Sequence, residues 1–220
     1  MDDEAAVSPG AGTRAPGDDT PVTQPGGRRP RGDTRERIQS VALELFAEQG
    51  YEKTSLREIA ERLDVTKAAL YYHFKSKEDI VRGFTEDYVT ELDALIAWGT
   101  AQPRTGETRG LLLDRYSDIV ERRLPVMRFL EQNQAAVHQL LPGHDRGDRR
   151  KLFRAQFQAL CDLLSEPGAP LRERVRASVA VISVGVSSLL FDSGAGDPGE
   201  LHAIVLETAC ELAGVETPPV

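Results

Sequence analysis

The chain has little cysteine, few aromatic residues and no long apolar run, and each scarcity excludes a class of protein. Only two of its 220 residues are cysteines, Cys161 and Cys210, and both fall within apolar helical patterns. Two such cysteines make no disulfide framework and lack metal-site spacing, so we expect reduced core residues. No apolar run is long enough to span a bilayer, and the start MDDEAAVSPG lacks the features of a signal peptide. We therefore expect a cytoplasmic protein.

The sequence also lacks the patterns of strands and of catalytic sites. From Thr34 onward, apolar residues recur at helical spacing without strand-like alternation. Ser, His and acidic residues are scattered without nucleophile-elbow or metal-ligand spacing, and no glycine-rich phosphate loop follows a strand. The prediction is an all-α protein that is not an enzyme and has no cofactor or metal.

Composition divides the chain into three parts. Residues 1–32 hold five prolines and six glycines and cannot bury enough apolar surface, so we expect a disordered arm. Its basic end, Arg28–Arg31, is either a solvated linker or an arm that enters a minor groove. Residues 33–78 are predicted to form a head of three short helices. Residues 79–220 are predicted to form a helical body.

The net charge of −8 is distributed unevenly between these parts. From Arg28 to Arg82 there are 12 basic and 10 acidic residues, whereas the remainder has 15 basic and 25 acidic residues. Acid is concentrated away from the head, so the total charge does not count against binding of nucleic acid by the head.

The head has the start and stop signals of a helix-turn-helix. The segment Ser55–Glu58 has the form of a capping box, and Thr66 is the next N-cap candidate. Asp64 lies between them and is a residue type that tolerates the left-handed conformation needed where a helix stops. Leu70 and Phe74 are four residues apart and would anchor the following helix to the core. This arrangement is typical of a motif that reads the major groove.

The helix after the turn carries the chemistry that a major-groove reader needs. Ala68 and Ala69 are small enough for close approach to the bases, and Lys67 can reach a guanine edge or a phosphate. Hydroxyl, ring and ammonium groups on the flanks can hold phosphates. Each residue alone would pass for an ordinary surface or packing residue, and only their combination indicates DNA binding. The candidate DNA-binding residues are Ser55, Arg57, Thr66, Lys67, Ala68, Ala69, Tyr71, Tyr72, His73 and Lys77.

A family resemblance covers positions 34 to 80, TRERIQSVALELFAEQGYEKTSLREIAERLDVTKAALYYHFKSKEDI, with LYYHFKSKE as its most specific part. This segment resembles the TetR family of transcriptional regulators. The resemblance implies a homodimer with a three-helix head and a variable body that binds a small molecule and dimerises through its last two long helices. By position, the residues that match base-facing places are Arg57, Lys67, Ala68 and Ala69, and those that match backbone contacts are Ser55, Tyr71, His73 and Lys77.

The segment departs from the family pattern at two positions. Asp64 stands where the family commonly has a glycine in the turn, so the geometry of this turn can differ from the family pattern. Ala68 also replaces a frequent glycine, and this change can alter which bases are preferred. The leading hypothesis is a ligand-responsive repressor that acts as a homodimer on a palindromic DNA operator. The alternative is a helical module that binds small molecules or proteins without affinity for DNA.

The body is expected to contain a long helix ending near Gln102-Pro103, then helices at 108–123, 125–141, 148–165, 170–191 and 199–213, separated by proline and glycine. The last two are apolar on several sides, so they either form a dimer interface or pack within one body. The dimerisation candidates are Val175, Val179, Ile182, Val186, Leu189 and Ile204. Polar or aromatic residues that interrupt apolar stripes are candidates to line a pocket for an unknown inducer: Trp98, Tyr116, Phe129, Asn133, Gln134, His138 and Phe157.

Overall fold

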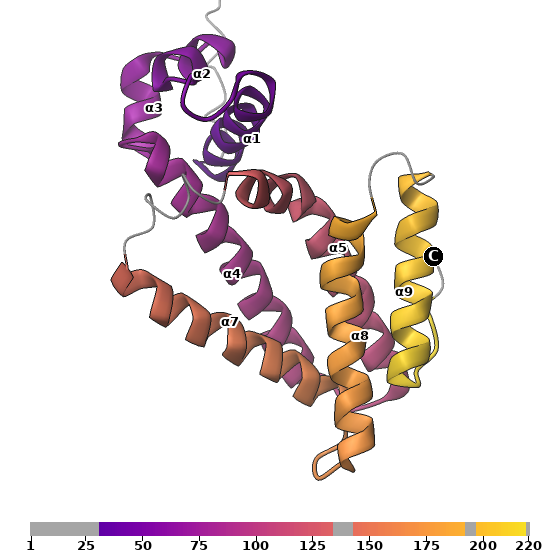
Figure 1. Ribbon diagram of the computed structural model, residues 1–220. Helices are drawn as coiled ribbons and strands as arrows, with labels where there is room; N and C mark the ends of the chain where they lie inside the picture. Colours follow the sequence, from indigo (N-terminus) through magenta and orange to yellow (C-terminus); the bar gives the residue numbers. More distant parts are fainter. Residues whose placement is uncertain (1–30, 134–142, 192–196, 219–220) are drawn as a thin grey trace, which may run out of the picture.

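The computed structural model describes residues 31–133, 143–191 and 197–218, and all regular structure in these ranges is helical (Figure 1). The predicted all-α class is thereby confirmed. A small head of three helices lies at one end of a larger helical body, as Figure 1 shows. Most of the arm predicted at 1–32 lies outside the described residues, although the first helix already begins at Arg31.

The head consists of α1 (Arg31–Gln49), α2 (Leu56–Arg62) and α3 (Lys67–His73). The predicted capping box is present at the start of α2. The Ser55 backbone N–H donates to Glu58 Oε2 at 2.7 Å, and the Glu58 N–H donates to Ser55 Oγ at 3.2 Å. Thr66 caps α3 by accepting from the Ala69 N–H at 3.2 Å. Asp64 has a φ of 54°, so it does adopt the left-handed conformation expected at this turn.

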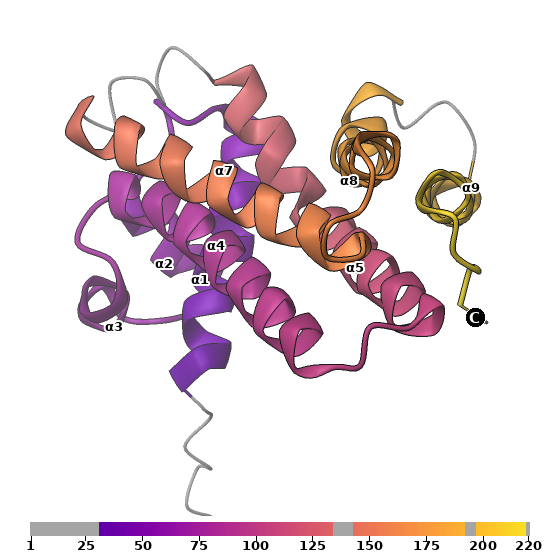
Figure 2. The same cartoon turned by 90° about the horizontal axis from the view of Figure 1, so that it is seen from below.

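The body consists of five described helices around a second core. They are α4 (Lys77–Ala101), α5 (Gly106–Gln132), α7 (Gly143–Leu164), α8 (Leu171–Leu190) and α9 (Pro198–Ala213). Helices α8 and α9 lie side by side along one flank of the body (Figures 1 and 2). Both cysteines are buried and reduced, as expected. No described helix is long and apolar enough to cross a membrane.

The prediction of a helix break at Pro125 is wrong, because α5 runs through this residue from Gly106 to Gln132. A proline inside a helix removes one hydrogen bond and is normally unfavourable. Here the turns after it are buried: Val126 and Phe129 belong to the apolar core of the head. Tertiary burial therefore outweighs the local cost. The remainder of the helix predicted at 125–141 lies outside the described residues from 134 onward.

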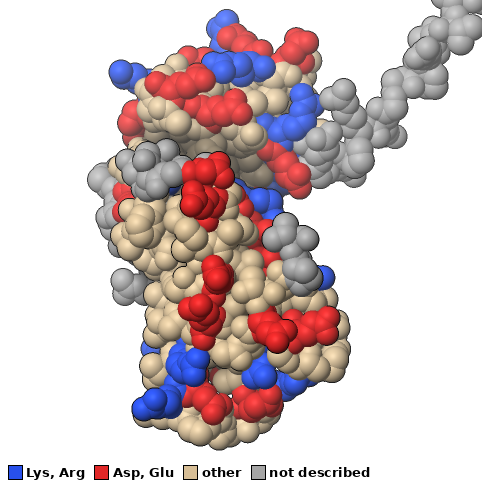
Figure 3. Space-filling view, turned by 90° about the vertical axis from the view of Figure 1, so that its right-hand side faces the viewer, with Lys and Arg blue, Asp and Glu red and all other residues tan. Residues whose placement is uncertain are grey.

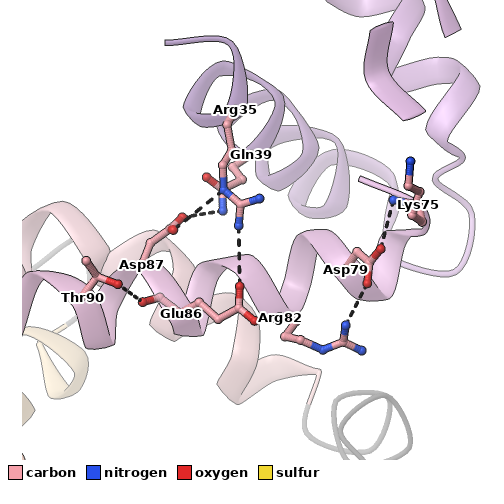
Figure 4. A network of polar contacts seen from close by, with 8 residues as sticks. All are labelled: Arg35, Gln39, Lys75, Asp79, Arg82, Glu86, Asp87 and Thr90. Atoms are coloured by element: carbon pink, nitrogen blue, oxygen red, sulfur yellow. Dashed lines mark hydrogen bonds and ion pairs between the residues drawn. The ribbon is translucent and has the colours of Figure 1, made fainter. Parts of the chain in front are cut away.

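The end of α5 joins the head to the body. The Phe129 ring stacks on Phe46 at 5.2 Å between centroids and also lies 6.1 Å from Tyr51 and 6.4 Å from Phe84. Figure 4 shows a polar contact between α1 and α4 on the same junction, where Gln39 Nε2 donates to Asp87 Oδ2 at 2.6 Å. Aromatic packing and this bond together fix the head on α4 and α5.

Candidate nucleic-acid interface

Helix α3 presents one face to the head core and the opposite face to solvent. Leu70 and Phe74 are 0% and 1% exposed, which confirms their predicted role as anchors. Lys67, Ala68 and Ala69 are exposed on the other side. Because Leu70 and Phe74 hold the helix in place, its exposed first turn is rigid. The small side chains of Ala68 and Ala69 allow a ligand as large as a DNA duplex to come close to the helix backbone.

The flanks of α3 carry exposed groups that can donate hydrogen bonds. Tyr72 is 64% exposed and Tyr71 is 37% exposed, and the ring of Tyr72 meets His73 edge-on at 5.3 Å. The Lys75 ammonium donates to the Tyr71 carbonyl at 2.7 Å, and the Lys67 ammonium lies 5.6 Å from the Tyr71 ring centroid. The predicted DNA-binding residues of α3 are therefore brought together on one accessible surface.

Arg57 lies on α2 and is bound to an acidic neighbour. Its Nε donates to Glu61 Oε1 at 2.7 Å, and this hydrogen bond raises the pKa of the exposed Arg57 guanidinium. The pKa of Glu58 is lowered because its carboxylate accepts from Ser55. A DNA phosphate or base could accept a hydrogen bond from the Arg57 Nε only if it displaced the Glu61 carboxylate. Arg57 is therefore available to DNA only when its bond to Glu61 is broken.

The Lys77 ammonium already has an intramolecular role. It donates to the Tyr51 carbonyl at 2.7 Å and lies 4.3 Å from the centroid of the Tyr51 ring. The Tyr51 hydroxyl in turn donates to Glu78 Oε1 at 3.0 Å, and burial, followed by this bond, raises the pKa of Tyr51. Lys77 thus links the start of α4 to the loop after α1, a role that spacing in the sequence does not reveal.

The predicted pocket residues do not gather at one place. Trp98 lines an open groove of about 390 Å³ between α4 and α5, where the Arg115 guanidinium lies 3.9 Å from its ring centroid. Tyr116 is buried in the body core and Phe157 packs against that core, whereas Phe129 belongs to the core of the head. Asn133 donates to the carbonyl of Phe129 at the end of its own helix. Gln134 and His138 lie outside the described residues.

Sequence reasoning missed a buried polar residue between α4 and α7. Gln156 is 3% exposed, and its Nε2 donates to Asp93 Oδ1 at 2.7 Å and to the Val89 carbonyl at 3.1 Å. Its Oε1 is buried and has no hydrogen-bond partner in the described part of the chain. A single glutamine in a helical pattern resembles a surface residue, so only the packing of α7 on α4 reveals it.

The predicted dimerisation residues form an exposed apolar stripe. On α8, Val175, Val179, Ile182 and Val186 are 41–51% exposed, and Ile204 on α9 is 52% exposed. Leu189 is half-buried. Figure 3 views the molecule from the flank of α9 and shows uncharged surface interrupted by acidic groups, with basic groups near the far end of the body. A contiguous apolar stripe of this kind is typical of a protein interface.

Comparison with known families agrees with this geometry. Residues 38–83 match the family described as "Bacterial regulatory proteins, tetR family". The HTH-type transcriptional regulator AcrR of Shigella flexneri is 52% identical over 48 residues, which are 22% of this chain and 22% of AcrR. The HTH-type transcriptional repressor KstR2 of Mycolicibacterium smegmatis is 29% identical over 150 residues, which are 67% of this chain and 68% of KstR2. The chain thus spans only about a fifth of the length of AcrR.

Similarity among solved structures extends beyond the head. A transcriptional regulator of the TetR/AcrR family from Thermobifida fusca YX-ER1 has a TM-score of 0.55 and 26% identity, with 81% of this chain and 97% of that chain covered. AibR, solved in complex with isovaleryl coenzyme A and operator DNA, has a TM-score of 0.54 at 19% identity and covers 79% of this chain and 96% of its own. The head and the body therefore both have counterparts in one fold.

Proposed function

Because this chain belongs, through its helix-turn-helix head, to the tetR family of bacterial regulatory proteins, we propose that it is a sequence-specific DNA-binding transcriptional regulator. The observation that carries the proposal is the exposure of Lys67, Ala68 and Ala69 on a helix anchored by Leu70 and Phe74. The exposed turn enters the major groove, and the tyrosines beside it donate to phosphates.

The working form is a homodimer that represses transcription from a palindromic operator. The exposed apolar stripe of α8 supports the dimer, since two copies would cover it. Two heads then reach half-sites about 34–36 Å apart. Repression is supported by the names of relatives such as the negative regulator IcaR of Staphylococcus epidermidis. The place of action is the cytoplasm.

A small molecule controls this dimer by binding in the body. Gln156 supports the site, because a ligand with a hydroxyl or amide N–H would satisfy its buried Oε1 between α4 and α7. Such a ligand changes affinity for the operator only if it binds the two head spacings with different affinity. Ligand binding by the structural relative AibR, in a complex that also holds operator DNA, supports this coupling.

The test is a direct measurement of DNA affinity with matched variants. Duplexes are first selected from random DNA by the purified dimer, and fluorescence anisotropy then gives the affinity for the selected and for scrambled sequences. We expect Tyr71→Phe to weaken binding to all sequences, because a phosphate contact carries no sequence information. Lys67→Ala should instead reduce the preference for the selected sequence, by about 1 to 3 kcal/mol if the lysine reads a base.

The control is Arg172→Ala, an exposed arginine on α8 far from the head. It should leave DNA affinity unchanged. Binding should fall steeply with salt, because phosphate contacts release counterions. If the unmodified dimer binds no duplex near physiological salt, the alternative gains support: a helical module that binds small molecules or proteins.

A further inference from the structure

Three side chains from two helices of the body converge where α5 packs against α9. Asp118 and Glu121 lie three residues apart on α5, and His202 lies near the start of α9. One ligand atom from each lies within 4.8 Å of the other two. The closest pair is His202 Nδ1 and Glu121 Oε2, which are 3.0 Å apart. His202 follows Glu121 by 81 residues in sequence, so motif spacing does not predict this triad.

The triad has unbalanced negative charge. Within the described part of the chain, neither Asp118 nor Glu121 pairs with a lysine or arginine, whereas Glu91 on the neighbouring α4 pairs with Arg122 and Arg123. Two carboxylates, those of Asp118 and Glu121, therefore lie beside a single imidazole, a set of ligand atoms that can hold an added cation.

A buried hydroxyl completes the setting. Ser117 is 4% exposed, and its Oγ lies 3.4 Å from His202 Nδ1. This hydroxyl therefore lies next to the same ring nitrogen as Glu121 Oε2, and a cation bound at Nδ1 would take the place of this contact.

We propose that Asp118, Glu121 and His202 bind a divalent transition-metal cation of the Zn²⁺ class. One imidazole nitrogen with carboxylate oxygens suits zinc, cobalt, nickel or manganese, whereas calcium and magnesium prefer oxygen ligands alone. Two ligand atoms that are each about 2.0–2.2 Å from zinc lie about 3.3–3.6 Å apart in a tetrahedral site. His202 Nδ1 and Glu121 Oε2 are 3.0 Å apart, so a small outward movement of the exposed Glu121 side chain would admit the cation between them. Both carboxylates are exposed, so Asp118 can turn toward the site and water fills the remaining position.

Binding would tie α9 to α5. Ile204 is two residues beyond the histidine and belongs to the apolar stripe on the outer surface. A bound cation therefore holds in place the helix that carries part of this surface. The site itself does not depend on the proposed DNA binding, and its test is readable even if no duplex is bound.

The experiment uses the full chain without a histidine tag, freed of metal by a chelator and dialysed against micromolar zinc. We expect one zinc per chain, measured by elemental analysis, and a higher melting temperature than in the chelator-treated protein. Cobalt at the same site should give visible absorption bands. Magnesium at the same concentration should have no effect.

The variants Asp118→Asn, Glu121→Gln and His202→Gln should each weaken zinc binding by about ten-fold or more. Their matched controls are Glu131→Gln, which changes an exposed carboxylate on the same helix, and His73→Ala, which removes an imidazole from the head. Both controls should bind zinc as tightly as the unmodified chain. If His202→Gln does not fold, the two carboxylate variants decide. Absence of zinc from the unmodified chain, or full binding retained by both carboxylate variants, would overturn the proposal.

Discussion

Asp64 controls the turn between α2 and α3 through its backbone. With a φ of 54° it occupies a region that costs most L-residues about 1–2 kcal/mol and that aspartate tolerates better than β-branched residues. We expect Asp64→Val to lower the free energy of unfolding by about 1 to 2 kcal/mol, and Asp64→Gly to change it by less than about 1 kcal/mol. Urea denaturation followed by circular dichroism measures both. An equal loss in the two variants would show that the carboxylate, and not the backbone, matters.

At the scale of residues, local chemistry makes the head predictable. The caps at Ser55 and Thr66 and the turn at Asp64 depend on neighbours within four residues, and the spacing of four residues between Leu70 and Phe74 places both on one face. All five are found as expected. The role of Lys77 was not predictable in the same way. Its partner carbonyl on Tyr51 is 26 residues away in sequence, so no local pattern records the bond.

At the scale of elements, α5 belongs to two cores at once. Leu113 and Val120 pack in the body, whereas Val126 and Phe129 pack in the head, with Pro125 at the change between them. The local preference of proline predicts a helix boundary at Pro125. The burial of Val126 and Phe129 against residues distant in sequence outweighs this preference, and the helix continues. The break could not be recognised as wrong from the sequence, because the residues that bury Phe129 lie in α1, the following loop and α4.

This double membership predicts the effect of truncating Phe129. Phe129→Ala removes a ring that contacts Phe46, Tyr51 and Phe84, and we expect a loss of about 3 to 5 kcal/mol in stability. Because the same ring joins head to body, unfolding should also separate into two transitions, seen by calorimetry. The control is Phe157→Ala, which truncates a ring packed on the body core alone. It should destabilise the protein while head and body still unfold together.

At the scale of the whole molecule, the exposed stripe on α8 decides the oligomeric state. The double variant Val179→Glu/Ile182→Glu places two carboxylates where each copy would bury an apolar side chain, and unpaired charges at an interface core are strongly unfavourable. We expect a folded monomer in sedimentation velocity, together with a large loss of affinity for a two-half-site duplex.

The matched control for this variant is Leu152→Glu, a 38% exposed leucine on α7 outside the stripe. It should sediment like the unmodified protein. A dimer that survives the double substitution would mean that α8 and α9 complete the core of a single body and that another surface mediates association. Sequence patterns left these two arrangements open, because apolar content on several sides of a helix fits both.

The difference in charge between the head and the body has a physical consequence for encounters in solution. The segment from Arg28 to Arg82 carries 12 basic against 10 acidic residues, whereas residues 83–220 carry 14 basic against 20 acidic residues. Near a polyanion, electrostatic torque turns such a particle so that its acidic end points away. The molecule is thereby oriented before it touches the polyanion, and a larger share of collisions begins at the surface around Lys67.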